Sequence, residues 1–213
     1  MKRAGISRKR PDWLAPLDDP RDEEILGAAF HVFVEKGFHG ATMLDIATRA
    51  RASKKTIYAR FKDKSALFRA LIAWGIRQNL PETMPPDDGD PVRALERHAR
   101  IVLSAMLRPE SLGLFRIVSA EAARFPEIGR VFDEMVRRSS VAILNALAVQ
   151  LTKAGIATIR DRVQFGEDFI ALVRGDVYFR VLAGAVPMPA DTKIRRQAAH
   201  AVRILLAAYA PLK

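Results

Sequence analysis

A short stretch of the sequence gathers side chains that bind anions. Between Arg49 and Lys64 there are seven basic residues and one acidic residue, Asp63, which gives +6 in sixteen positions. A solvated helix face more often alternates the two signs of charge. Lysine and arginine donate to phosphate oxygens and to the acceptors of guanine, so this density favours contact with a nucleic acid.

Local signals place the cluster on two short helices that follow a longer one. A first helix is expected from Arg21, with acidic residues in its first turn and Gly37 at its C-terminal cap. Thr42 and Asp45 have the spacing of a capping box and predict a second helix of about nine residues.

The third helix is predicted to begin at Ser53, a residue type that caps helices, after a brief turn at Arg51 and Ala52. Ile57 and Phe61 then face inward at i, i+4 spacing. The opposite face carries four outward residues, namely Lys54, Lys55, Tyr58 and Ala59. Two short helices joined by a tight turn, with basic residues outward on the second, indicate a helix-turn-helix unit that reads the major groove.

The rest of the chain also has helical periodicity, and no segment predicts a strand. Asp63 can cap a fourth helix from Lys64, which Pro81 ends. Later helices are expected near 91–107, 111–123, 126–152, 161–186 and 192–210. The expected fold is therefore all-α, with about nine helices in three segments. These are a flexible basic arm over 1–20, a three-helix helix-turn-helix domain with its connecting helix over 21–79, and a larger helical domain over 80–213.

Composition narrows the class of protein. The chain has 35 Lys and Arg against 24 Asp and Glu, a net charge of +11, and a surplus of this size usually serves a polyanion. No apolar run is long enough for a membrane span and no signal peptide is evident, so we expect a cytoplasmic protein with no membrane partner. Without cysteine there is no disulfide, thiolate zinc site or cysteine nucleophile.

Arg21 to Leu71 resembles the N-terminal domain of the TetR family of transcriptional regulators. The resemblance is carried by "ILGAAFHVFVEKGFHGATMLDIATRARASKKTIYARFKDKSALF", about a dozen positions at the family's spacing over a quarter of the chain. It implies that Thr42 to Phe61 is the DNA-binding unit and that Ser53 to Phe61 is its recognition helix.

Roles for single residues follow from this resemblance and from hydrogen-bonding chemistry. Thr42 and Ser53 are expected to clamp phosphates at helix N-termini, although plain capping uses the same geometry. Base edges are assigned to Lys54, Lys55 and Thr56. Phosphate contacts are assigned to Tyr58 and Lys64.

The chain departs from the family pattern at two positions. Arg51 stands where a glycine is usual, and a bulky residue in a tight turn costs about 1 kcal/mol if its φ is positive. Lys55 stands where a small residue is common, so no operator sequence can be transferred.

The C-terminal part resembles the effector-side domains of one subgroup of these regulators, through "FRIVSAEAARFPEIGRVFDE" and "FIALVRGDVYFRVLAG". The resemblance implies that the last two helices pair with those of a second copy, an interface that would absorb the apolar stripe of the final helix. The alternative is that this stripe packs only within the chain. The stripe consists of Ile194, Ala198, Ala201, Val202, Leu205 and Tyr209.

A pocket for a small-molecule effector is expected among the helices between about 64 and 180, although each candidate wall residue can equally be plain core. The candidates are Trp74, Met106, Phe115, Arg116, Phe132, Met135 and Tyr178. Arg116 or Arg124 can pair with an anionic ligand, or simply with Glu121 one turn away.

Catalysis is not expected, because the four histidines have no paired metal-ligand spacing and no phosphate-binding loop or nucleophile elbow is present. We expect no catalytic residues, no metal and no cofactor.

The predicted function is a sequence-specific regulator, most simply a repressor, that binds a palindromic double-stranded DNA operator as a homodimer and is released by an effector. Two alternatives stay open, a nonspecific architectural DNA-binding protein and a basic peripheral membrane or protein-interaction module. The segment Arg8 to Arg10 can grip a minor groove, contact phosphates nonspecifically, or be a disordered start.

Overall fold

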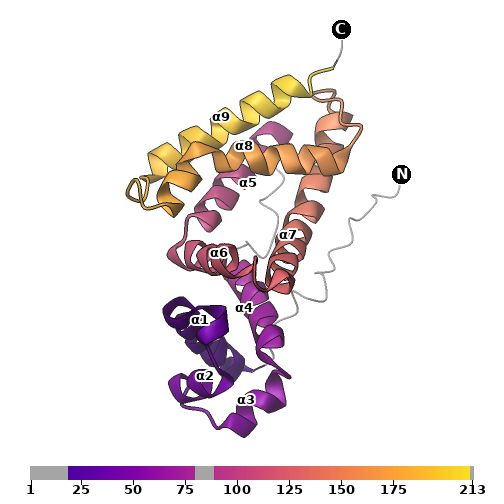
Figure 1. The fold of residues 1–213 in the computed structure, drawn as a ribbon. Helices are drawn as coiled ribbons and strands as arrows, with labels where there is room; N and C mark the ends of the chain where they lie inside the picture. Colours follow the sequence, from indigo (N-terminus) through magenta and orange to yellow (C-terminus); the bar gives the residue numbers. More distant parts are fainter. Residues whose placement is uncertain (1–18, 80–88, 212–213) are drawn as a thin grey trace, which may run out of the picture. The chain divides into compact units, whose positions relative to one another are not determined.

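A computed structural model describes residues 19–79 and 89–211 of the chain (Figure 1). The predicted basic arm therefore lies almost wholly outside the described residues. The described part is all-helical, with nine α-helices and no strand among those residues. The chain divides into two compact units, Met1–Arg77 and Gln78–Lys213.

The first unit begins with α1, Pro20–Gly40. Asp19 caps it by accepting a hydrogen bond from the Arg21 backbone N–H, and Pro20 occupies the first helical position, where its missing N–H costs nothing. Gly37 interrupts the helix with φ 69°, a left-handed conformation that glycine adopts without strain. The glycine predicted to end the first helix is thus where the regular helix breaks.

Two short helices follow, α2 over Met43–Arg49 and α3 over Lys54–Arg60. Thr42 and Asp45 form the predicted capping box at the start of α2, and Ser53 caps α3 by accepting from the Thr56 N–H. Between the helices Arg51 has φ 49°, the one positive φ of a non-glycine residue in the described chain. The predicted strain in the turn is therefore present.

Helix α4, Lys64–Asn79, begins where Asp63 Oδ1 accepts from the Ala66 N–H at 2.7 Å. Its buried residues Leu67, Leu71 and Ile72 face the unit's core. Phe68 lies edge-on to Phe33 and Phe38, with both ring centroids 5.3 Å away. These apolar contacts join α4 to α1, while α2 packs on α1 and α3 packs on α2.

The second unit contains five helices (Figure 1). They are α5 over Pro91–Met106, α6 over Pro109–Glu121, α7 over Pro126–Lys153, α8 over Arg162–Leu182 and α9 over Asp191–Ala208. Three of them begin at a proline, as expected for a residue that cannot donate to a preceding turn. Helix α9 packs on both α5 and α8.

The apolar stripe of the last helix packs inside the chain. Ala198, Ala201, Val202 and Leu205 are buried in the core of the second unit, and Ile194 and Tyr209 pack partly buried against it. The Tyr209 hydroxyl also donates to Asp168 Oδ2 at 2.7 Å. The expectation that this stripe serves an interface with a second copy is therefore wrong, because the helix faces its own α5 and α8 with those residues.

Helix α8 contains a break that the sequence analysis did not anticipate. Gly175 has φ 51° and ψ −168°, a conformation almost restricted to glycine. A Cβ atom at this position would lie 2.5 Å from Nε2 of Gln197, which itself donates to the Leu172 carbonyl at 2.9 Å. The break lets a side chain of α9 reach a carbonyl of α8.

No helix in the described residues is long and apolar enough to cross a membrane.

Candidate nucleic-acid interface

The two residues predicted to clamp phosphates both cap helices. The Thr42 hydroxyl accepts from the Asp45 N–H at 3.0 Å and donates to Asp45 Oδ2 at 2.7 Å. Ser53 Oγ accepts from the Thr56 N–H at 3.0 Å. Hydrogen bonds from Lys36 and then from Thr42 lower the pKa of Asp45 to about 2. Both caps are therefore formed within the chain itself, and both residues are exposed.

The outward face of α3 is available to a ligand. Lys54, Lys55 and Ala59 are exposed, the Tyr58 side chain is 46% exposed, and Thr56 is half-buried. Ile57 and Phe61 are buried on the opposite side, as predicted. The Lys54 ammonium lies 5.8 Å from the centroid of the Tyr58 ring. An aromatic hydroxyl and two cations thus share one exposed surface.

The seven cations of this region divide into two groups. Arg49 donates to Glu35 Oε1 at 2.6 Å, Arg60 is bound by Asp19 and Asp22, and Lys64 is bound by backbone carbonyls. The other four of the seven, Arg51, Lys54, Lys55 and Lys62, are exposed and have no acidic partner among the residues that the structure describes. The charge free to meet a phosphate is thus smaller than the sequence count of +6.

Lys64 closes the end of α1. Its ammonium donates to the carbonyls of Phe38 at 2.6 Å, His39 at 3.1 Å and Ala41 at 2.9 Å. It also lies 4.7 Å from the centroid of the Phe38 ring. Three carbonyls match the three N–H donors of an ammonium group, so the predicted phosphate contact of Lys64 must compete with them.

Three of the residues predicted to line an effector pocket lie together in the second unit. The ring centroid of Phe115 is 5.7 Å from that of Phe132 and 6.0 Å from that of Tyr178. Met106 packs partly buried against the unit's core. Trp74 is half-buried in the first unit, and the side chain of Met135 lies outside the described part.

Arg116 caps the end of α8 and pairs with no acid among the described residues. Its Nε and Nη2 atoms donate to the Leu182 carbonyl at 3.1 and 2.8 Å. Burial raises the pKa of the neighbouring Tyr178 phenol, while the charges of Arg174 and Arg116 act in the opposite direction. Arg174 and Arg116 therefore place positive charge near the aromatic cluster of Phe115, Phe132 and Tyr178.

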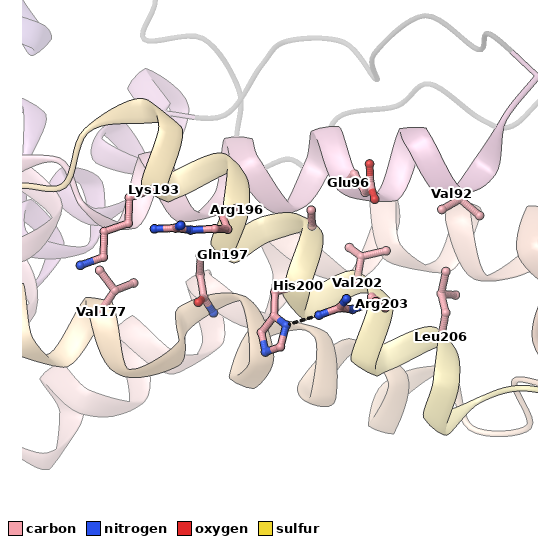
Figure 2. A pocket seen from close by; sticks show the side chains of 11 residues that line it. Val92, Glu96, Val177, Lys193, Arg196, Gln197, His200, Val202, Arg203 and Leu206 are labelled. Atoms are coloured by element: carbon pink, nitrogen blue, oxygen red, sulfur yellow. Dashed lines mark hydrogen bonds between the residues drawn. The ribbon is translucent and has the colours of Figure 1, made fainter.

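A separate groove of about 910 Å³ lies along α9 (Figure 2). Val92 and Glu96 of α5 and Val177 of α8 contribute to its walls, and Lys193, Arg196 and Arg203 of α9 make it basic. None of the seven residues predicted for the pocket lines this groove.

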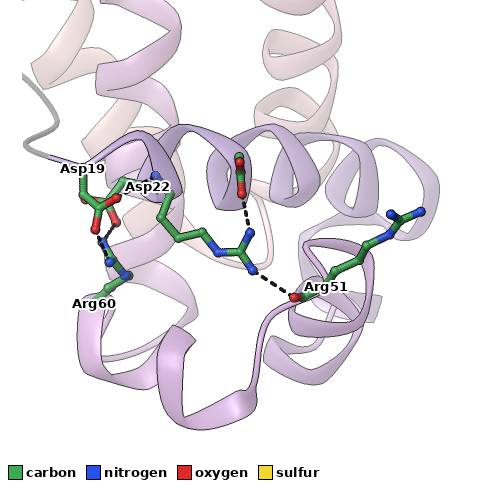
Figure 3. Close-up of polar contacts among 6 residues, drawn as sticks. Asp19, Asp22, Arg51 and Arg60 are labelled. Carbon is green, nitrogen blue, oxygen red and sulfur yellow. Dashed lines mark hydrogen bonds and ion pairs between the residues drawn. The ribbon is translucent and has the colours of Figure 1, made fainter.

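Sequence reasoning missed the residues that hold the helix-turn-helix from outside (Figure 3). Asp19 and Asp22 bind the Arg60 guanidinium, and Arg21 donates to the Arg51 carbonyl at 2.8 Å. The acidic first turn of α1 is visible in the sequence, where the pattern indicates only a favourable interaction with the helix dipole. Nothing in the local pattern joins that turn to residues 30 to 41 positions away.

Comparison with protein-family profiles covers both units. Residues 25–71 match the profile of bacterial regulatory proteins of the tetR family. Residues 93–211, more than half of the chain, match the C-terminal domain of AefR-like transcriptional repressors.

Individual relatives are similar over most of their length. The HTH-type transcriptional regulator YdeS of Bacillus subtilis (strain 168) is 26% identical over 172 residues, covering 78% of this chain and 81% of YdeS. Among solved structures, the flavonoid-responsive regulator FrrA has a TM-score of 0.74 at 26% identity, over 91% of this chain and 98% of FrrA. A TetR transcriptional regulator from Agrobacterium tumefaciens has a TM-score of 0.73 at 26% identity, over 90% and 95% of the two chains.

Proposed function

The chain belongs to the TetR family of DNA-binding transcriptional regulators, which are not enzymes, and on that premise we propose that it is a repressor that binds a palindromic operator as a homodimer and is released by a small-molecule effector. The observation that carries the proposal is the exposed outward face of α3, where Lys54, Lys55 and Tyr58 are free to enter a major groove. Lys54, Lys55 and Thr56 contact base edges. Phosphates are contacted by Tyr58, by the capped N-termini at Thr42 and Ser53, and by Lys64 if it leaves its carbonyls.

Repression is proposed because the profile that matches residues 93–211 describes AefR-like repressors. One relative with the opposite effect is the transcriptional activator FasR of Mycolicibacterium smegmatis, which is 40% identical over 74 residues but covers only 30% of this chain. The sign of regulation therefore needs a transcription assay on the operator once the operator is known.

The homodimer is proposed to form through the outward faces of α8 and α9. Large apolar side chains are exposed on both helices, with Val163 66%, Phe179 48% and Ile204 40% exposed. A two-fold axis between the copies would place two recognition helices about 34–36 Å apart, in successive major grooves. This spacing requires a palindromic site.

The effector is proposed to be an aromatic molecule that binds beside Phe115, Phe132 and Tyr178, because rings of a ligand stack on such a group. The name of the relative FrrA, a flavonoid-responsive regulator, makes flavonoids the first compounds to test. Release follows if the ligand binds more tightly to a conformation with mis-spaced recognition helices than to the operator-bound conformation. A flavonoid panel that neither binds the protein nor releases the operator would remove this class of effector.

Selection of bound fragments from sheared host genomic DNA, at physiological salt and followed by sequencing, tests the proposed function. One or a few palindromic sites are expected, with a preference over bulk DNA of at least about 10³. The Lys54→Ala/Lys55→Ala variant should lose these sites. The Arg130→Ala/Lys153→Ala variant removes the same charge from exposed positions of α7, outside the proposed interface, and should keep them. Unselective recovery by the wild type would instead favour an architectural DNA-binding protein.

A further inference from the structure

We propose that Arg60 is a positioning residue, held by Asp19 and Asp22, and that the first turn of α1 grips both ends of the recognition helix α3 to set its orientation for DNA. The inference rests on the proposed function, because it explains how the outward face of α3 is oriented toward the DNA bases. It assigns to Arg60 a role other than the phosphate contact that its place in a basic cluster suggests.

The grip at the C-terminal end of α3 consists of one cation and two anions (Figure 3). Arg60 Nη2 is bound to Asp19 Oδ2 and Nη1 to Asp22 Oδ1. The Arg60 side chain is 27% exposed and that of Asp22 is 19% exposed, so both are shielded more than a usual surface pair. A guanidinium has a fixed fork of donors, and binding two carboxylates at once restricts its orientation.

The grip at the N-terminal end acts on the turn before α3. Arg21 Nη2 donates to the Arg51 carbonyl at 2.8 Å, and Arg21 Nη1 is bound to Glu24. Arg51, whose carbonyl accepts this bond, has a positive φ of 49°. The same helical turn thus contacts the residue that leads into α3 and the residue that ends it.

Asp19 links the two grips. Its Oδ1 atom accepts from the Arg21 N–H at 2.8 Å, which caps α1, while Oδ2 accepts from Arg60. These two hydrogen bonds, in that order of effect, lower the pKa of Asp19, so the carboxylate stays charged at neutral pH. The pKa of Arg60 is raised by its hydrogen bonds to Asp19 and Asp22.

Helix α3 needs such a support because it is only seven residues long, and Ile57 is the residue within it that is buried. A helix of this length is not stable alone, so its direction depends on tertiary contacts. We call these contacts of Asp19, Arg21 and Asp22 with Arg51 and Arg60 the clasp. If the clasp raises the fraction of molecules in which α3 has the orientation that binds DNA, the apparent operator affinity rises by the same factor.

A phosphate contact by Arg60 conflicts with this geometry. Two carboxylates surround one guanidinium, which leaves a local charge of −1 where a phosphate would have to approach. A phosphate that approached Arg60 would be repelled by both carboxylates and would compete with them for the terminal nitrogens, so the ion pairs disfavour the contact.

The two roles predict opposite results for Asp19→Asn/Asp22→Asn, measured as affinity for the selected operator at several salt concentrations. Asparagine keeps the cap of α1, so the helix should still form. Positioning predicts about fivefold weaker binding by this variant and by Arg60→Met. The variant that combines Asp19→Asn, Asp22→Asn and Arg60→Met should bind the operator no more weakly than either of these two variants. The salt dependence of operator affinity should be the same as that of the wild type.

A phosphate contact predicts instead that Asp19→Asn/Asp22→Asn binds more tightly, because Arg60 is freed. Arg60→Met would then reduce the slope of log affinity against log salt by about one. Either result overturns the proposal. Glu23→Gln/Glu110→Gln is the control of equal charge, since Glu23 lies in the same turn of α1 without a place in the clasp.

Amide hydrogen exchange separates failure of the clasp from failure of the proposed function. The Phe61 N–H donates to the Ile57 carbonyl at 2.9 Å, at the end of α3 that the clasp holds. In Asp19→Asn/Asp22→Asn this amide should exchange about fivefold faster than in the control variant. If the wild type selects no DNA, the proposed function fails while this rate still tests the clasp, and an unchanged rate overturns the clasp.

Discussion

His98 of α5 is a polar side chain in an apolar core. It is 1% exposed, its ring stacks on Phe169 at 5.6 Å, and neither ring nitrogen has a hydrogen-bond partner among the described residues. Desolvation by burial disfavours the charged imidazolium and lowers the pKa to about 4. The folded second unit therefore holds this histidine neutral.

The unfolded chain takes up a proton at His98 near pH 6.5, whereas the folded chain does so only near pH 4. Between these values the unfolded state binds more protons, so the stability of the fold is lost as the pH falls. The free energy of unfolding should drop by about 2 kcal/mol between pH 7.5 and 5 through this group alone. Urea denaturation at both pH values measures the difference. His98→Leu should remove this part of the pH dependence, and an identical slope in the variant would show that other groups cause it.

The backbone of Arg51 is strained, and the hydrogen bond that this residue accepts is made by its carbonyl and not by its side chain. An L-residue at φ 49° costs about 1 kcal/mol relative to glycine, while the Arg21 hydrogen bond is made to the backbone carbonyl and survives substitution. Arg51→Gly should therefore raise the unfolding free energy of the first unit by somewhat less than 1 kcal/mol, since glycine also adds entropy to the unfolded chain. Thermal unfolding checks the sign. Arg51→Ala, which keeps the strain, should show no such gain.

Lys55 and Lys64 should respond differently when each is replaced by alanine. Lys55 is exposed on the outward face of α3, so Lys55→Ala should change the preferred base at one operator position. Lys64 binds three carbonyls, so Lys64→Ala should lower the stability of the first unit by about 2 kcal/mol and weaken all DNA sequences alike. Selection from randomised sites, together with thermal unfolding, separates the two. Equal loss on every sequence for both variants would contradict base reading by Lys55.

At the scale of elements, signals within a few residues were predicted correctly. The capping box of Thr42 and Asp45, the cap at Ser53 and the break at Gly37 each depend on neighbours in sequence. Contacts between distant segments were not predictable, because residue type does not say which partner folding will supply. Arg60 with Asp19, Arg116 with the Leu182 carbonyl and the inward stripe of α9 all belong to this second class.

The break in α8 gives a prediction for one element. Gly175→Ala introduces a Cβ at φ 51° and displaces the Gln197 amide from the Leu172 carbonyl, so the second unit should lose roughly 2–3 kcal/mol. Gly166→Ala in the same helix is the control. Its new Cβ would lie 3.7 Å from Leu144 Cδ1, an ordinary contact, so that variant should keep or gain stability. Denaturant midpoints for the two variants compare them directly, and equal midpoints would mean that α8 does not need the break.

At the scale of the whole molecule, the assignment of the α9 stripe changes where a second copy can bind. Because the stripe fills the core of its own unit, an interface on α8 and α9 must use their outward residues. Those residues are mixed, since Phe179 and Ile204 are exposed among cations such as Lys193 and Arg203. Fully buried like charges are costly, so the apolar side chains are expected at the centre of such an interface and the cations at its rim.

Phe179→Glu tests this arrangement. In the dimer, the new carboxylate would be buried without a partner, and the contacts of the Phe179 ring would be lost. Together these effects should raise the dimer dissociation constant by at least about 30-fold. Sedimentation over a range of protein concentrations measures the constant. Val34→Glu is the control: it replaces a residue that is 50% exposed in the first unit, and it should leave the dimer dissociation constant unchanged. The operator affinity of Phe179→Glu should fall in parallel, because a monomer reaches only one half-site. A fully dimeric Phe179→Glu protein would place the interface elsewhere on the chain.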